Sequence, residues 1–259
     1  MIRKKDIHEA KQKRNNDDAL ASIDKVKNEF IALASHQLRT PLSVVNWYTE
    51  MLLNGDAGKL TKEQKSFLAE IYSSTQSMIA LVNSLLNISR LELGTLNVEP
   101  ELTDIRGIIS GVLTDFSSMV KKKHLKVAIR IPSTLSKFVV DGKLIKIVIQ
   151  NLIKNAVKYT PDSGSIFLSV IRDKKKIILL IRDSGIGIPR NQQSRIFSKF
   201  FRADNAKEVD TDGSGLGLYI VKAIVQKVGG KVWYVSSQNH GSSFFVALPN
   251  RRMKKSVLK

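Results

Sequence analysis

Apolar side chains recur at three- and four-residue steps along the first third of the chain. Between about residues 19 and 54 this spacing, typical of an amphipathic helix, is kept by Ile23, Val26, Phe30, Leu33, Leu38, Val45 and Leu52. A second run has the alternating steps of a coiled-coil seam, through Phe67, Ile71, Met78, Leu81, Leu85 and Ile88. Gly55 and Gly58 end the first helix, and Thr61 with Gln64 is a capping signature for the second. The pattern predicts an all-α helical hairpin over residues 19–94.

The hairpin has more apolar side chains than an isolated helix pair can bury. Two helices of roughly 50 Å, at about 1.5 Å per residue, expose their remaining apolar positions unless another surface covers them. A symmetric homodimer forming a four-helix bundle is the simplest closure. Packing against the rest of the same chain is the alternative.

A histidine and a proline interrupt the first helical pattern. In the stretch LASHQLRTPLS, His36 lies five residues before Pro41. Proline has no N–H to donate to the carbonyl of Gln37, and its ring presses on that carbonyl, so we expect the helix to bend or open just after His36. Thr40, which precedes the proline, is also disfavoured in helical geometry. The sequence therefore predicts a strained turn that carries an imidazole and a hydroxyl.

The pattern changes near Gly94, where we place a domain boundary at residues 94–96. The sequence then predicts helices at 104–122, 141–159 and 216–228, and strands at 125–132, 165–173, 175–183, 231–237 and 242–249. Because helices and strands fall into blocks, we expect an α+β sandwich in which helices cover one face of a mixed sheet. The predicted divisions are a basic N-terminal segment or input helix (1–18), the hairpin (19–94), the α+β domain (95–250) and a basic tail (251–259).

Composition limits the classes of function. The chain has 259 residues, no cysteine and a net charge of +19, and +4 of that charge falls in residues 1–14 and +5 in residues 251–259. No apolar run approaches the roughly 20 residues that span a bilayer, so we expect a chain without a transmembrane segment that works in the cytoplasm. The charge raises binding to nucleic acid or to an anionic membrane as a hypothesis. A basic solvated surface is the alternative, which the absence of zinc-finger, helix-turn-helix and aromatic RNA-binding motifs favours, so no specific nucleic-acid partner is expected.

One predicted helix carries an unusual polar face. Asn151, Asn155 and Lys158 are spaced at i, i+4 and i+7 in NLIKNAVKYT and share one side of the helix. Amide oxygens are ligands for Mg²⁺, and a lysine beside them can neutralise a phosphate. A polar face turned to solvent is the alternative, but asparagine is a poor helix former, and two of them in mid-helix suggest a function.

Two glycine-rich segments complete a candidate nucleotide site. In RDSGIGIP, Asp183 ends a strand and Gly185 and Gly187 follow, so a flat ligand can approach the backbone while the carboxylate accepts from an amino group. In DGSGLGLYIVK, Gly213, Gly215 and Gly217 lead into a helix, which suits phosphate binding. The P-loop lysine is missing, and so is a Rossmann unit. Residues 189–212 between the segments are predicted to be a lid or a disordered loop.

Five motifs in this order resemble the catalytic core of sensor histidine kinases of bacterial two-component systems. Along the chain, HQLRTPL is similar to the family's phospho-acceptor box, NLIKNAVKYT to its asparagine box, DSGIGIP to its first glycine box, IFSKFFR to its phenylalanine box and GSGLGL to its second glycine box. The resemblance covers residues 19–249. It implies a dimerising hairpin that carries His36, an ATP-binding domain of the Bergerat (GHKL) type, and transfer of a phosphoryl group from His36 to an aspartate of a response regulator.

The resemblance also implies roles for single residues. His36 would accept the γ-phosphoryl group of ATP, Thr40 would position a water that dephosphorylates the partner, and Asp183 would accept from the adenine amino group. Asn155 would hold Mg²⁺, with Asn151, Lys158 and Tyr159 near the phosphates. Arg202, the last residue of the phenylalanine box, is a candidate contact of the γ-phosphate, with a surface salt bridge as the alternative. The glycine boxes would frame the mobile lid through Gly185, Gly187, Gly213, Ser214, Gly215, Leu216, Gly217 and Leu218.

One position departs from the family's usual pattern. Gln37 stands where the family commonly has Glu or Asp, which takes the second proton of the imidazole. Glutamine cannot act as that base, although it can hydrogen-bond the ring. Three functions remain open: a histidine kinase, an ATP-binding core that acts mainly as a phosphatase of its partner, and a basic ATP-dependent nucleic-acid protein. Because the sequence contains no sensor domain, we expect either a fragment of a larger receptor or a kinase driven by another subunit. Membrane association through a longer parent chain or a partner is an alternative to a purely cytoplasmic location.

Overall fold

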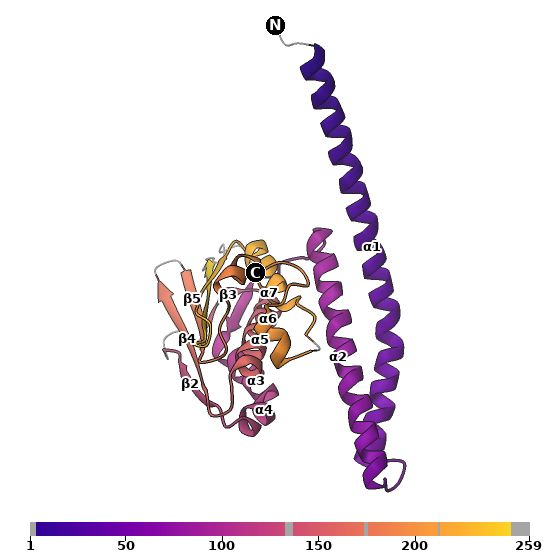
Figure 1. Cartoon of the computed structure of the whole chain (residues 1–259), viewed down its shortest axis with the longest axis vertical. Helices are drawn as coiled ribbons and strands as arrows, with labels where there is room; N and C mark the ends of the chain where they lie inside the picture. Colours follow the sequence, from indigo (N-terminus) through magenta and orange to yellow (C-terminus); the bar gives the residue numbers. More distant parts are fainter. Residues whose placement is uncertain (1–3, 133–136, 174–175, 212, 250–259) are drawn as a thin grey trace, which may run out of the picture. The chain divides into compact units, whose positions relative to one another are not determined.

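The structure, a computed structural model, describes residues 4–132, 137–173, 176–211 and 213–249 (Figure 1). The predicted tail at residues 251–259 lies outside the described residues. The chain forms two compact units, with the division between Leu96 and Asn97.

The first unit is a pair of long helices, α1 (Lys4–Asn54) and α2 (Lys62–Glu92). Gly55 and Gly58 in the connection have φ angles of 89° and 111°, which other residues rarely adopt. The predicted cap of α2 is present: the backbone N–H of Gln64 donates to the hydroxyl of Thr61 at 3.2 Å, and the N–H of Thr61 donates to Oε1 of Gln64 at 2.9 Å. The predicted hairpin is therefore confirmed, but its first helix begins at Lys4 instead of near Ala19.

Pro41 does not interrupt α1, so the predicted opened turn is wrong. The helix is continuous from Lys4 to Asn54 with Pro41 inside it. One missing backbone hydrogen bond is small against the packing of two long helices on each other. Hydrogen bonds also join the helices on both sides of the proline, from Arg39 Nη2 to Asn83 Oδ1 at 2.9 Å and from Gln76 Nε2 to Asn46 Oδ1 at 2.7 Å.

The second unit contains a mixed sheet with helices against one face (Figure 1). The sheet has the strand order β2-β4-β5-β7-β6, in which β2 runs parallel to β4 and the other neighbours are antiparallel. Its strands are β2 (Lys126–Arg130), β4 (Ser165–Asp173), β5 (Lys176–Asp183), β6 (Lys231–Ser236) and β7 (Ser242–Pro249). A separate antiparallel pair is formed by β1 (Glu101–Asp104) and β3 (Lys137–Val140).

The helices of the second unit pack on one another and on the sheet. They are α3 (Ile105–Asp115), α4 (Ser117–Lys122), α5 (Gly142–Tyr159), α6 (Asp204–Val209) and α7 (Gly217–Lys227), with a short 3-10 helix η2 (Arg190–Arg195). Fully buried side chains between α5, α7 and the sheet include Ile149, Ile153, Leu168, Ile181 and Ile220. The predicted α+β sandwich is confirmed. The predicted helix at 104–122 is divided at Phe116, and β3 and α6 were not predicted.

Candidate nucleotide-binding site

Asp183 ends β5 in a buried position at the first glycine box. Asp183 is 8% exposed. Its Oδ1 accepts hydrogen bonds from the backbone N–H of Gly185 at 2.9 Å and from that of Ser242 at 3.2 Å. Burial raises the pKa of this carboxyl, and the two backbone hydrogen bonds partly offset the rise. Both of these bonds use Oδ1, so Oδ2 can accept a hydrogen bond from a ligand.

The end of α5 contacts the same glycine box. The backbone N–H of Ile186 donates to the carbonyl of Tyr159 at 3.1 Å, and a Cβ on Gly185 would lie 2.6 Å from that carbonyl oxygen. At Gly187 φ is 62°, and a Cβ would lie 1.9 Å from the carbonyl oxygen of Ser237. Only glycine allows these two approaches, so the box lies directly against the end of α5 at Gly185 and against Ser237, after β6, at Gly187.

The second glycine box meets the start of the asparagine face. A Cβ on Gly217, the first residue of α7, would lie 2.7 Å from Oδ1 of Asn151. The other side of the Asn151 amide donates to the carbonyl of Ile147 at 2.8 Å, which orients Oδ1 toward the glycine. Leu216 is fully buried before α7, and its N–H donates to Oγ of Ser214 at 3.4 Å. Leu218 follows in α7 and is half-buried.

Lys158 and Arg202 meet around a carboxylate that the sequence did not single out. Lys158 Nζ forms an ion pair with Asp210, and Arg202 Nη2 lies 3.3 Å from the same carboxylate oxygen. The predicted alternative for Arg202, a surface salt bridge, is partly met, since the ion pair exists but the arginine side chain is only 12% exposed. Beside this group burial raises the pKa of the Tyr159 phenol, and the charge of Arg202 opposes that rise.

The residues present fit ATP and a magnesium ion. Arg202 Nε is buried and has no hydrogen-bond partner among the described residues, so it can donate to an anion. Asn155 is half-buried one turn after Asn151 on α5. Its amide oxygen suits Mg²⁺, which usually takes few protein ligands together with phosphate oxygens and waters. No group of three or more His, Cys, Asp or Glu side chains in the described ranges could hold a metal ion.

The segment between the glycine boxes contains ordered structure. Asn205 on α6 donates from Nδ2 to the carbonyl of Gly187 at 3.0 Å, which ties α6 to the first glycine box. The phenylalanine box contains Phe197, Phe200 and Phe201. Phe197 packs edge-on against Tyr234 with ring centroids 5.8 Å apart, whereas Phe200 is 64% exposed. A Cβ on Gly215 would lie 2.6 Å from the backbone of Phe200.

Lys123 fixes the end of α5 from outside the motifs. Its Nζ donates to the carbonyls of Val157 at 3.0 Å, Lys158 at 2.9 Å and Thr160. Burial lowers the pKa of this lysine, and Asp162 partly offsets the change. A cation at the C-terminus of a helix satisfies carbonyls that lack intrahelical partners. The sequence shows only a Lys-rich stretch here, so nothing distinguished Lys123 from Lys121 and Lys122.

We expect Lys123→Met to destabilise the second unit by about 2 kcal/mol, because hydrogen bonds from a charged donor to buried carbonyls are lost. ATP affinity should fall with it, since the carbonyl of Tyr159 supports the first glycine box. The measurement is denaturant unfolding together with titration of ATP. Lys122→Met, on an exposed neighbour, is the matched control, and an equal loss in both variants would contradict the role of Lys123.

The candidate phospho-acceptor residues lie in the first unit. His36, Gln37 and Thr40 are all exposed side chains on α1. Ser35, directly before the histidine, is 2% exposed, so His36 begins the outward face of this turn. An exposed imidazole on a helix surface is accessible to a phosphoryl donor.

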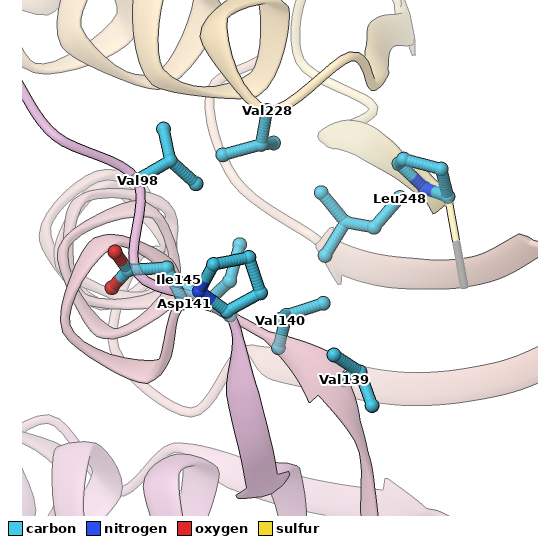
Figure 2. A pocket seen from close by; sticks show the side chains of 9 residues that line it. Val98, Val139, Val140, Asp141, Ile145, Val228 and Leu248 are labelled. Carbon is cyan, nitrogen blue, oxygen red and sulfur yellow. The ribbon is translucent and has the colours of Figure 1, made fainter. Parts of the chain in front are cut away.

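A separate pocket lies at the other end of α5 (Figure 2). Its lining is almost entirely apolar and contains Val98, Pro100, Val139, Val140, Ile145, Val228, Leu248 and Pro249. The one acidic lining residue, Asp141, accepts from Leu144 N at 3.0 Å through Oδ1 and from Glu99 N at 2.8 Å through Oδ2. Asp141 therefore caps α5 and holds the preceding segment, and none of the motif residues lines this pocket.

Comparisons with known proteins agree with both units. The family model of histidine kinase-, DNA gyrase B- and HSP90-like ATPases matches residues 140–252, and that of the His Kinase A phospho-acceptor domain matches residues 26–94. The chain belongs to the sensor histidine kinases of two-component systems. The predicted family is confirmed, and so is the GHKL fold of the second unit.

Individual relatives show how much of a kinase the chain covers. The circadian input-output histidine kinase CikA of Synechococcus elongatus is 31% identical over 241 residues, which are 91% of this chain and 32% of that protein. Sensor histidine kinase WalK of Bacillus subtilis is 32% identical over 229 residues, covering 88% of this chain and 37% of WalK. The structure of full-length ShkA in complex with AMPPNP matches with a TM-score of 0.69 and 29% identity, over 85% of this chain and 45% of that one.

The chain thus spans about a third of the length of the curated relatives it matches. Among the helices within the described ranges, none combines the length and the apolar character needed to cross a membrane.

Proposed function

We propose that the chain is an ATP-dependent protein histidine kinase core that phosphorylates His36 and passes the phosphoryl group to an aspartate of a response regulator. The observation that carries the proposal is the assembly of the asparagine face of α5, both glycine boxes and two cations in one unit, while an exposed histidine lies in the other. Use of ATP fits a cytoplasmic reaction. The ShkA structure was obtained with AMPPNP, an ATP analogue, which supports the nucleotide assigned here.

In the proposed nucleotide complex, Oδ2 of Asp183 accepts from the adenine amino group. Glycine amides at the start of α7 face the phosphates, where a helix N-terminus favours anions. Lys158 and Arg202 offset the phosphate charge. Asn155 would hold Mg²⁺ together with the phosphates, and the ion would supply positive charge beside the phosphate oxygens.

In the proposed transfer, a neutral imidazole nitrogen of His36 attacks the γ-phosphorus, and the bond from that phosphorus to the β,γ-bridging oxygen breaks. ADP leaves with the electron pair, and a phosphoramidate forms. The other ring nitrogen must lose its proton to a base for the ring to return to neutrality. Gln37 cannot accept that proton, so water or a carboxylate at another position must accept it.

The proposed kinase acts as a homodimer. Large apolar side chains exposed on the single hairpin include Phe30 at 69%, Leu33 at 62%, Trp47 at 58%, Phe67 at 57% and Ile71 at 47%. A second copy would cover such surfaces in a four-helix bundle. If analytical ultracentrifugation finds a monomer at micromolar concentration, the proposed homodimer is contradicted.

A second function, dephosphorylation of the response regulator, rests on the same helix face. Gln37 and Thr40 are exposed beside His36, and both carry polar groups that can orient a water. In this alternative the chain binds ATP but accumulates little phosphohistidine.

We expect Gln37→Glu to accelerate autophosphorylation about 100-fold, because a positioned general base contributes roughly that factor. The initial rate of label transfer from γ-labelled ATP measures the effect. Gln37→Ala is the matched control and should not exceed the wild-type rate. A rate in Gln37→Glu at or below that of the wild type would show that the glutamine does not limit proton removal.

A further inference from the structure

The carboxylate of Asp210, at the end of α6, holds both cations assigned to the ATP phosphates. Its Oδ2 pairs with Lys158 Nζ and lies 3.3 Å from Arg202 Nη2. The exposed fractions of the three side chains are 25% for Lys158, 15% for Asp210 and 12% for Arg202. Because little solvent reaches these groups, their attraction is screened less than that of a surface pair.

Arg202 is held at this place by more than the carboxylate. It donates to the carbonyls of Thr211 at 2.9 Å and Ala206 at 3.2 Å and to the carbonyl of Asp210. These carbonyls belong to the last turn of α6 and the residues that follow it, where a cation is favoured. The arginine and the end of α6 therefore fix each other.

The second glycine box fits closely around this ion pair. A Cβ on Gly213 would lie 2.8 Å from Asp210 Oδ2 and 3.0 Å from Arg202 Nε. Lys154, one turn before Lys158, also lies in the field of Asp210: burial lowers the pKa of Lys154, Lys158 lowers it further, and Asp210 raises it. The Asp210 carboxylate thus lies between two cations, Lys158 and Arg202, next to the predicted phosphate loop.

We propose that Asp210 is an internal competitor of the ATP phosphates. The inference rests on the proposed function, in which Lys158 and Arg202 bind those phosphates. A carboxylate and a phosphate oxygen repel each other and compete for Lys158 Nζ and Arg202 Nη2, so ATP binding weakens the contacts of Asp210 and loosens the end of α6. The apparent affinity for ATP is then the intrinsic affinity multiplied by the fraction of molecules in which Asp210 does not hold the cations. Asp210 reduces the gain in affinity that each added phosphate gives, because only the phosphates compete with it.

The test is calorimetric titration of Asp210→Asn with adenosine, MgADP and MgATP. Asparagine keeps the shape but removes the charge, so we expect MgATP to bind about tenfold more tightly, MgADP to gain less, and adenosine to bind as in the wild type. Glu208→Gln, which removes one acid from an exposed position on α6, is the matched control and should bind MgATP as the wild type does. Thermal unfolding monitors the fold of each variant.

A double-mutant cycle separates competition from a general loosening of the lid. Lys158→Met should weaken MgATP binding, and in that background Asp210→Asn should give a smaller gain, because one of the contested cations is absent. Unchanged or weaker MgATP binding in Asp210→Asn, or an equal gain for adenosine, would overturn the inference while the proposed function stands. If neither the wild type nor Glu208→Gln binds MgATP, the proposed function itself fails.

Discussion

Replacing His36 by alanine should leave ATP affinity unchanged and abolish incorporation of label from γ-labelled ATP. In the proposed reaction the imidazole is the nucleophile, and alanine has none. The residue is exposed on a continuous helix, and alanine is the best helix former, so α1 should keep its structure. We therefore expect the incorporation of label to fall at least about a thousandfold, to the background of the assay.

A second exposed histidine provides the control for this experiment. His240 lies between β6 and β7 with Nδ1 2.9 Å from the carbonyl oxygen of Gln238. His240→Ala makes the same chemical change outside the proposed acceptor, and it should take label at the wild-type rate. Retention of acid-labile label in His36→Ala would identify another acceptor and refute the assignment.

Replacing Asp183 by asparagine should weaken ATP binding about 10- to 100-fold. Asparagine can keep the acceptor for Gly185 N and Ser242 N, but it then presents an NH₂ group to the adenine amino group, and one charge-assisted hydrogen bond of about 1.5–3 kcal/mol becomes a clash of donors. Inosine triphosphate carries a carbonyl in place of that amino group. We therefore expect Asp183→Asn to bind inosine triphosphate more tightly than the wild type does. The preference for ATP over inosine triphosphate should become smaller or reverse.

The same substitution should not destabilise the second unit. Burial raises the folded-state pKa of Asp183 above its ordinary value of 3.8, so ionising this group disfavours folding. The associated loss of stability is absent at pH below 3.8 and develops as pH rises through the folded-state pKa. Asparagine has no charge to bury, and Asp183→Asn should be at least as stable as the wild type at neutral pH. Parallel losses of stability and of affinity for both nucleotides would show that Asp183 only supports the fold.

The helix and strand pattern was predicted well from the sequence, because caps, glycine turns and apolar periodicity depend on residues that are close together in the chain. Thr61 and Gln64 cap α2 wherever that helix packs, and Gly187 requires a backbone approach that no other residue permits. The buried position of Asp183 at a strand end also follows from its place in the pattern. The family and the fold were therefore accessible from the sequence alone.

The missed features depend on contacts between distant residues. Pro41 disfavours a helix locally, but packing of α1 on α2 overrides that preference over a long element. Strand β3 has only four residues and pairs with β1 across a separation of more than 30 residues, so it has no distinctive pattern. Asp210 is one acid among several in a polar stretch, and only the folded chain reveals that it reaches Lys158 and Arg202.

The proposed reaction forms one covalent bond between His36 and phosphorus, and locating the phosphoryl group in the wild-type protein tests whether that bond forms. After incubation with ATP and Mg²⁺, phosphorus NMR and peptide mapping under alkaline conditions identify the type of bond and the residue. The expected result is an acid-labile, base-stable phosphoramidate on His36. An acid-stable phosphoester on Thr40 or another hydroxyl, or no phosphoryl group although ATP binds, would contradict the proposed kinase reaction.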